Sequence, residues 1–470
     1  MNDKALIEKL ESLPLDFWDF KEEDTKKFTH GIHSYPAIMV SPISKNIIKI
    51  VKEIMNIETL YDPFMGSGSV LIESILNGVK HTYGTDLNPL ALLLSKVRTT
   101  PLKMSQIVWI KNVYIDIINF AFEKYKDLPF KLHQYIVNEK QLDITDKKGW
   151  GENADIYLEE FKAKYNIDIE FPKFKNIGFW FKPQVIFELK IIKDTITTIE
   201  DENIKNFLLI TFSEIVRKVS NTRNGEFKLY RIAKEKLLNY NYNTKQEYID
   251  LLQKNIEKMI SFVEECNGLG DFSVDIKKCS CAKLDNFEEL LDDSLDLVIT
   301  SPPYGDSRTT VAYGQYSRLS LQWIDCDCDE AQNIDRSLLG GVVRKRYDNS
   351  LDSETLNKLI KEIEIVDKKR SLEVLAFYYD LDKCIESIAK KMKKNSYQFW
   401  VVGNRTVKNV YLNTDLIIAE MAKKYGLNHI YTFNRNIVNK VMPSVNSPTN
   451  EKGKTISTMM NEYIVVLKKE

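Results

Sequence analysis

A strand, a glycine turn, a helix and a second strand follow one another over residues 57–86, and this order constrains the fold most. An apolar run leads into Asp62 and predicts a buried strand. Gly66 and Gly68 then allow a tight turn with close backbone approach before an apolar helix. The second strand ends at Asp86. This is the pattern of a nucleotide-binding crossover in a parallel sheet.

The sequence of the turn restricts the class of ligand that it can bind. It has the form Asp-Pro-Phe-x-Gly-x-Gly and lacks the third spaced glycine of the dinucleotide fingerprint. That pattern resembles the S-adenosylmethionine loop of amino-methyltransferases, in which no pyrophosphate has to be held. Asp86 is positioned to accept hydrogen bonds from a ribose diol. An alternative role for Asp86 is that of a helix cap before Pro89, and both roles stay open at this point.

A second motif follows another apolar run further along the chain. Strands are expected over 273–277 and 295–299, and the latter delivers Thr300-Ser301-Pro302-Pro303-Tyr304 at its carboxyl end. Ligands bind at that edge in open parallel sheets. A fifth strand over 397–405 and a closing antiparallel pair over 427–433 and 463–467 are expected to complete the sheet.

The residue types of this second motif suit an amine-bearing ring. An exocyclic amine on cytosine or adenine is a poor nucleophile, because its lone pair is delocalised into the ring. The Ser301 hydroxyl and the Pro302 carbonyl can accept its two hydrogens, and two successive prolines fix that carbonyl without reorganisation. Tyr304 can stack on a ring that has left the duplex. A strand-ending turn without such a role is the structural alternative.

The order of glycine loop, acid, insertion and Ser-Pro-Pro-Tyr resembles the amino-specific (N4-cytosine or N6-adenine) DNA methyltransferases of prokaryotic restriction-modification systems. The resemblance covers residues 30–100 and 271–470. It implies an α/β, Rossmann-like sheet, mostly parallel with an antiparallel closing strand and a large, mainly helical insertion. It also implies S-adenosyl-L-methionine as cofactor and double-stranded DNA as substrate, with the target base flipped out.

Site residues carry over from the same resemblance. The glycine loop and the segment before it are expected to hold the cofactor, with Tyr35 and Pro36 over its methionine end and either Leu87 or Asn88-Pro89 beside its adenine. Related enzymes often bind the adenine amine with an acid where this chain has Ser280 or Cys281, so that contact is open here, with the backbone and Asp285 as alternatives. The predicted cofactor residues are Tyr35, Pro36, Asp62, Pro63, Phe64, Gly66, Gly68, Asp86, Leu87, Ser280 and Cys281, and the predicted catalytic residues are Ser301, Pro302, Pro303 and Tyr304.

The target base and the substrate class leave alternatives. Serine at the head of the tetrad is more typical of N4-cytosine enzymes, whereas N6-adenine enzymes usually carry Asp or Asn. Cytosine is therefore favoured. Some tRNA guanine-N2 methyltransferases share the Asp-Pro-Phe loop and Pro-Pro-Tyr, but they usually carry a long N-terminal RNA-binding domain. A non-catalytic S-adenosylmethionine sensor has no need of an amine-polarising pocket.

Three parts of the chain are predicted to have distinct roles. Residues 1–100 form an N-terminal segment with the cofactor half, and 271–470 form the catalytic half. Residues 101–270 read as a mainly helical insertion, large enough to be a target-recognition subdomain. Its helices are expected over 104–125, 204–219 and 243–266. Its basic residues either line a duplex or form ordinary surface: Arg217, Lys218, Arg223, Lys228 and Arg231.

Composition sets outer limits for the 470-residue chain. The formal net charge is −1, so affinity for DNA must come from local basic patches. The six cysteines lack zinc-site spacing, which predicts reduced thiols and no metal. No apolar run is long enough to span a bilayer, and a cytoplasmic, prokaryotic location is expected. A cognate restriction endonuclease acting separately is a further expected partner.

Overall fold

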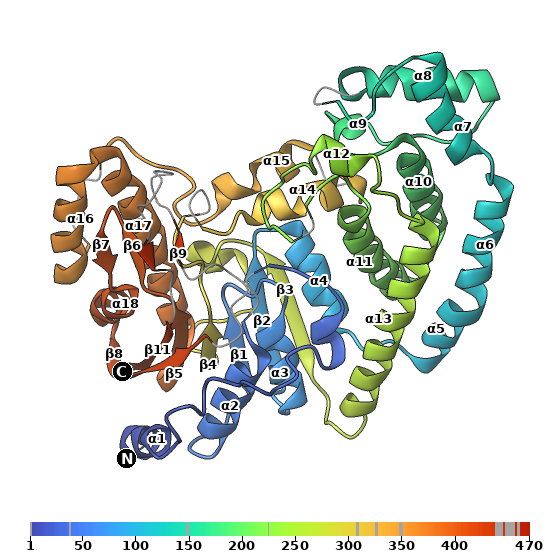
Figure 1. The fold of residues 1–470 in the computed structure, drawn as a ribbon. Coiled ribbons are helices and arrows are strands. Elements are labelled where there is room, and N and C mark those ends of the chain that lie inside the picture. Colours follow the sequence, from blue (N-terminus) through green and yellow to red (C-terminus); the bar gives the residue numbers. More distant parts are fainter. Residues whose placement is uncertain are drawn as a thin grey trace.

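A seven-stranded sheet runs through the middle of the molecule (Figure 1). The computed structural model describes residues 2–36, 39–146, 150–223, 225–306, 310–324, 328–346, 351–437, 445–446, 456–457 and 461–470. Within them the strand order is β3-β2-β1-β4-β5-β11-β8. The strands are β1 Thr59–Asp62, β2 His81–Asp86, β3 Ser273–Lys278, β4 Leu295–Thr300, β5 Met392–Val402, β8 Leu427–Asn436 and β11 Asn461–Lys469.

The sheet has the predicted Rossmann-like arrangement, mostly parallel with an antiparallel closing strand. Strands β3, β2, β1, β4 and β5 are mutually parallel, and β11 is antiparallel to both β5 and β8. The expected closing antiparallel pair is thus confirmed, as are the first four strands. The fifth strand begins five residues before its predicted start and ends at Val402. Two short pairs lie outside this sheet: β6 Arg405–Val407 with β7 Val410–Leu412, and β9 Val445–Asn446 with β10 Ile456–Ser457.

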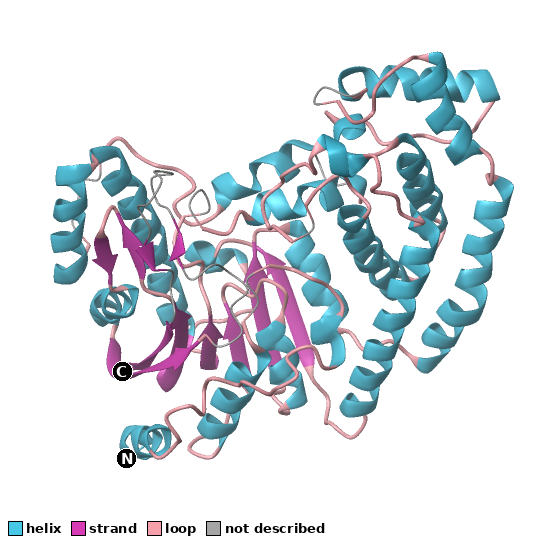
Figure 2. Cartoon of the chain, viewed as in Figure 1, coloured by secondary structure: helices cyan, strands magenta, loops and turns pink. Residues whose placement is uncertain are grey.

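Helices cover both faces of the sheet. Successive residues of a strand point to opposite faces, and here both sets are apolar, so each face has to be buried. On β4, Leu297 and Ile299 pack in one core with α1 and α2, while Val298 packs in another with α17 and α18. Figure 2 shows the strands enclosed in this way. The helices of these layers are α1 Asn2–Glu11, α2 Ser41–Lys52, α3 Ser69–Leu76, α4 Pro89–Thr99, α14 Tyr313–Trp323, α15 Cys328–Ser337, α16 Glu354–Val366, α17 Lys368–Lys391 and α18 Thr414–Ala422.

The insertion is helical and gathers beside the sheet, next to α4 (Figure 1). The helices expected at 104–125, 204–219 and 243–266 are all present, the first with one π turn, η2 (Ile110–Tyr114). Residues of this block share one core with α4 and α14. Its helices are α5 Met104–Trp109, α6 Ile115–Lys124, α7 Leu128–Gln134, α8 Ala154–Tyr165, α9 Ile177–Trp180, α10 Pro183–Thr197, α11 Glu202–Lys218, α12 Lys234–Leu237 and α13 Thr244–Cys266.

No helix in the described part of the chain is long and apolar enough to cross a bilayer.

Candidate active site

The carboxyl ends of five parallel strands meet along one edge of the sheet. The register pairs Asp62 with Gly84, Asp86 with Lys278 and Thr300 with Trp400. The residues that follow these strand ends therefore lie in one row, where ligands bind in such sheets. The structure thereby brings the predicted cofactor segment and the predicted catalytic segment together.

A buried hydrogen bond joins the two predicted segments. The Asp62 carboxylate accepts from the Thr300 hydroxyl at 2.7 Å and from the Phe64 amide at 3.1 Å. Burial raises the pKa of Asp62 to about 7, and the bond to Thr300 opposes that rise. The next residue, Pro63, is also fixed, because its carbonyl accepts from the Thr85 hydroxyl at 3.0 Å. Asp62 thus sets the relative position of the turn and the Ser301 segment.

Both glycines of the turn have left-handed backbone conformations. Gly66 has φ of +49° and Gly68 has φ of +78°, which side chains other than glycine rarely adopt. At Gly68 an added Cβ would lie 2.9 Å from the Ser95 hydroxyl, so glycine lets the turn pack on α4. At Gly66 the nearest atom is 3.8 Å away, on the Tyr35 ring. The turn thus packs tightly at Gly68, whereas an added Cβ at Gly66 would make only an ordinary contact.

Helix α4 holds the carbonyls of this turn. The Ser95 hydroxyl donates to the Gly66 carbonyl at 2.9 Å, and the Arg98 guanidinium donates to the Ser67 carbonyl at 3.0 Å. Arg98 also donates to the carbonyls of His30 and His33, both at 2.9 Å. It is fully buried, and burial lowers its pKa to about 9. Sequence reasoning missed Arg98, because a single arginine in an amphipathic helix carries no signal of its own.

Asp86 closes the glycine turn from the neighbouring strand. Its carboxylate accepts from the Gly66 amide at 3.0 Å and from the Asn88 amide at 2.8 Å. Burial raises its pKa to about 6, against the effect of these bonds. The cap of α4 is Asn88, whose side chain accepts from the Leu90 amide. The helix-cap alternative for Asp86 is therefore wrong, since the cap lies two residues later.

The segment before α2 reaches the same edge. Tyr35 is buried, and its hydroxyl accepts from the Asn88 side chain at 2.9 Å. Its ring stacks against Tyr313 of α14 with the centroids 6.2 Å apart. Pro36 is buried beside it, and Leu87 is half-buried next to Asp86. The structure thus brings Tyr35 into contact with Asn88, the residue that follows Leu87.

The structure separates the two residues offered for the adenine contact. Ser280 caps η5 (Cys281–Asn286) by accepting from the Ala282 amide, and it stays half-exposed. Cys281 is buried, with its Sγ 2.7 Å from Sγ of Cys384 in α17. Its thiol therefore faces the core in this structure. Of the pair, Ser280 is the one with surface to offer a ligand.

A hydrogen-bonded chain runs back from Ser301. The Ser301 hydroxyl donates to the Tyr304 hydroxyl at 3.3 Å, which donates to the Glu462 carboxylate at 2.8 Å. Arg435 donates to the other Glu462 oxygen at 2.8 Å. Because the Ser301 proton points at Tyr304, its lone pairs remain available as acceptors. Burial raises the pKa of Tyr304 well above its ordinary value, so it stays protonated. Glu462 and Arg435 were missed, because they lie far along the chain on β11 and β8.

The residues after the tetrad are also fixed. Gly305 lies against Arg405, where an added Cβ would come within 2.0 Å of the guanidinium. Asp306 is buried and pairs with Arg370 at 2.8 Å and Arg405 at 3.5 Å. The backbone that follows Tyr304 is thereby tied to α17 and to the start of β6.

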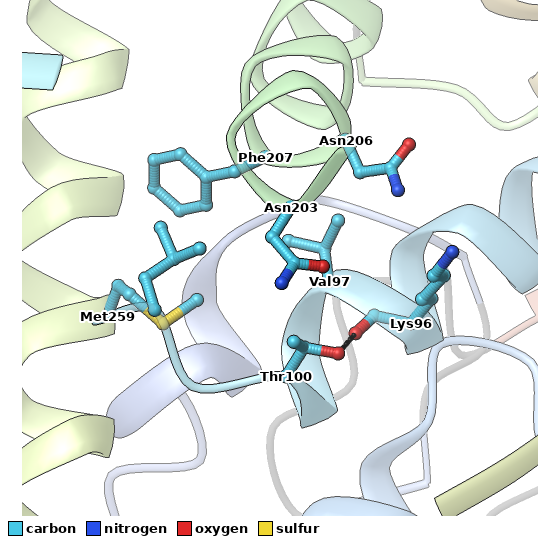
Figure 3. Close-up of a pocket in the computed structure, with 8 residues that line it drawn as sticks. Lys96, Val97, Thr100, Asn203, Asn206, Phe207 and Met259 are labelled. Carbon is cyan, nitrogen blue, oxygen red and sulfur yellow. Dashed lines mark hydrogen bonds between the residues drawn. The ribbon is translucent and has the colours of Figure 1, made fainter. Parts of the chain in front are cut away.

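The site does not coincide with the crevice shown in Figure 3. That crevice lies between α4, α11 and α13, and Lys96, Thr100, Asn203 and Met259 are among its lining residues. None of the predicted cofactor or catalytic residues lines it. We therefore take the edge of the sheet as the candidate site.

Comparison with known proteins assigns the family. The chain is 41% identical to the type II methyltransferase M.MvaI of Kocuria varians, over 99% of this chain and 97% of that protein. It is 27% identical to the type II methyltransferase M.MjaII of Methanocaldococcus jannaschii, over 61% and 62% of the two chains. No family model matches it.

Among solved structures, the rRNA methyltransferase aviRa from Streptomyces viridochromogenes shares 8% identity at a TM-score of 0.30, covering 93% of this chain and 88% of that one. A score that low supports no conclusion. The near full-length match to M.MvaI does. The chain therefore belongs to the type II methyltransferases, the S-adenosylmethionine-dependent DNA methyltransferases of restriction-modification systems.

Proposed function

We propose that this enzyme methylates an exocyclic amine of a base flipped from duplex DNA, with N4 of cytosine favoured over N6 of adenine. The observation that carries the proposal is the position of Ser301. It follows the strand next to the glycine turn, and its hydroxyl proton is directed at Tyr304. Family membership supports DNA over the tRNA alternative, and the complete tetrad supports catalysis over a sensor role.

The residue types at the turn fit S-adenosylmethionine. The Gly66 turn lies against the Tyr35 ring, and Asp86 is half-buried at the end of β2. We expect Asp86 to hold the ribose, the glycine turn and Tyr35 to hold the methionine part, and Leu87 with Ser280 to border the adenine. When bound, the cofactor supplies an electrophilic methyl group.

The chain's own groups act on the amine. The Ser301 oxygen accepts one amine hydrogen and the Pro302 carbonyl accepts the other, which localises the nitrogen lone pair away from the ring. Pro303 keeps that carbonyl fixed, and Tyr304 stacks on the base. The base must leave the duplex first, because its amine cannot be reached inside the stack. Transfer is then direct, with no covalent intermediate on the enzyme.

Two further roles belong to the proposal. The helical block 101–270 supplies target recognition, because it packs on α4 and α14 beside the site. A separate restriction endonuclease cuts the same sequence when it is unmethylated. Both proteins act in the cytoplasm of a prokaryotic cell, where the DNA is.

The labelled nucleoside tests the proposed function. The purified chain is incubated with tritiated S-adenosylmethionine and either duplex DNA or bulk tRNA, and the products are digested. N4-methylcytosine is the expected product, and N6-methyladenine would move the assignment to the alternative base. Label in tRNA alone would overturn the DNA substrate. Modification-sensitive sequencing of DNA from cells that express the protein then gives the recognition sequence.

Asp86→Asn is expected to weaken S-adenosylmethionine binding by about 10- to 100-fold, the range for losing a hydrogen bond to a charged acceptor. Affinity of the wild-type enzyme should fall as the pH drops below about 6, because protonation removes an acceptor from Asp86. Titration calorimetry across this range measures both effects.

Asp271→Asn is the control for this pair of effects, since Asp271 is an exposed acid before β3. It should bind the cofactor like the wild type. In Asp86→Asn, any remaining pH dependence is expected to follow Asp62, whose pKa is about 7. Unchanged affinity of Asp86→Asn at every pH would exclude Asp86 from the cofactor site.

A further inference from the structure

A short hairpin projects from the helical block. Thr222 and Arg231 form an antiparallel bridge, and the Arg223 amide donates to the Tyr230 carbonyl at 2.8 Å. The base is fixed in two ways. The Asn221 amide donates to the Trp180 carbonyl at 2.7 Å, and the Arg231 guanidinium donates to backbone carbonyls of the segment 144–146. We call residues 221–223 and 225–232 the hairpin. Its base is rigidly supported.

The tip of the hairpin is aromatic and faces solvent. Phe227 is 44% exposed and Tyr230 is 47% exposed. The Arg223 guanidinium lies over the Tyr230 ring, 6.0 Å from its centroid. Arg223 also pairs with Glu226 at 3.3 Å, but both side chains are exposed, so a phosphate can replace this partner with little loss. Two exposed aromatic rings beside an arginine whose partner can be replaced form a surface that suits nucleic acid: bases stack on the rings, and the arginine binds a phosphate.

Aromatic contacts connect this tip to the candidate site. The Phe227 ring lies 6.3 Å from the ring of Tyr316, and Tyr316 lies 6.0 Å from Tyr35. The Leu229 amide donates to the Gln315 side chain at 3.3 Å. Tyr316 and Gln315 belong to α14, the helix that follows the 301–304 segment in the chain. The hairpin is therefore linked to Tyr35 through the ring of Tyr316, and it lies at the side of the site formed by α14.

Three other basic residues of this region are already engaged. Arg217 stacks on Tyr316 at 4.3 Å, and Lys218 pairs with Glu247. Arg231 lies over the Phe179 ring at 4.5 Å besides its carbonyl contacts. Arg231 fixes the base of the hairpin, and Arg217 donates to the Glu226 carbonyl within it. Arg223 and Lys228 are the basic residues toward the tip, and the partner of Arg223, Glu226, is exposed.

This inference rests on the proposed function. We propose that the hairpin contacts duplex DNA next to the target base, with Phe227 packed against the neighbouring base pair and Arg223 on a phosphate. Extruding a base leaves its neighbours unstacked on one face. An apolar ring that occupies this place holds the duplex open, as apolar wedges do in other DNA-binding proteins. The Phe227 ring is sufficiently exposed for this role, and the hairpin that carries it is anchored to the helical block.

The test uses duplex DNA with 2-aminopurine in place of the target base, in the recognition sequence found by sequencing. In Phe227→Ala, DNA affinity should fall by about 5- to 100-fold, the range for losing one base–aromatic stack. The fluorescence increase that accompanies extrusion should shrink, while S-adenosylmethionine affinity and the melting temperature stay unchanged. Phe227→Trp should restore both DNA readouts.

Phe120→Ala is the matched control. Phe120 is 74% exposed on α6, which lies on the far side of the helical block from α14 (Figure 1). It should bind and extrude like the wild type. If the wild type methylates DNA and Phe227→Ala also binds and extrudes like the wild type, the role of the hairpin is overturned. The proposed function would then still stand. A wild type that methylates no DNA would overturn the proposed function.

Discussion

Ser301→Ala is expected to lower the turnover number by about 100- to 1000-fold, as removal of one preorganised polar group from a reacting centre does. The variant keeps the Pro302 carbonyl but loses the side-chain acceptor for the amine. S-adenosylmethionine affinity should stay within a factor of about two, because only the transition state needs this acceptor. Single-turnover kinetics with duplex DNA and calorimetry with the cofactor separate the two quantities.

Ser294→Ala is the control for this substitution. Ser294 immediately precedes β4, at the opposite end from Ser301, and its hydroxyl donates to the Leu291 carbonyl at 2.6 Å. Its loss should leave turnover near the wild-type value. If Ser301→Ala also retained normal turnover, Ser301 would have no part in the chemistry. The tetrad would then be a strand-ending turn only.

Arg98→Leu is expected to lower the free energy of unfolding by about 3 to 5 kcal/mol, the range for removing one member of a buried charged network. Three carbonyls, those of Ser67, His30 and His33, would lose their donor inside the protein. Glu214 would also lose a nearby positive charge that lowers its pKa. Since domains are stable by only about 5 to 15 kcal/mol, denaturant unfolding should show the effect plainly.

Lys96→Leu provides the comparison on the same helix. Lys96 is exposed, and exposed substitutions usually change stability by less than about 0.5 kcal/mol. The Arg98 variant should in addition bind S-adenosylmethionine more weakly, because Arg98 fixes the carbonyl between the two turn glycines. A stable Arg98→Leu variant with normal cofactor affinity would contradict the role given to this arginine.

Local sequence was enough to predict the strand ends and the two motifs. The apolar runs before Asp62 and Ser301 mark buried strands, and the glycines between them mark a turn, because each signal depends on neighbouring residues. The same reasoning predicted a cap at Asp86 as one alternative, which was wrong. Asp86 and Asn88 are both good capping types, and only the backbone geometry shows which one accepts from the helix amides.

Local sequence patterns could not predict the contacts between segments that are distant in the chain. Glu462 holds the Tyr304 hydroxyl from β11, and Arg98 reaches back to the segment 30–33. The thiol of Cys281 turned to Cys384 instead of the site edge. None of these pairings leaves a periodic pattern, because each depends on how helices and strands pack after the chain has folded.

The sequence by itself determined the parallel sheet, its glycine turn, its Ser-Pro-Pro-Tyr segment and the resemblance to amino-specific DNA methyltransferases. Tertiary structure alone decided that Thr300 bonds to Asp62, that the Ser301 proton points at Tyr304, and that the hairpin stands beside α14. The physical reason is the distance along the chain over which each kind of interaction acts. Propensity and periodicity act over a few residues, whereas buried hydrogen bonds and ring contacts join groups that only the folded backbone brings within a few ångströms.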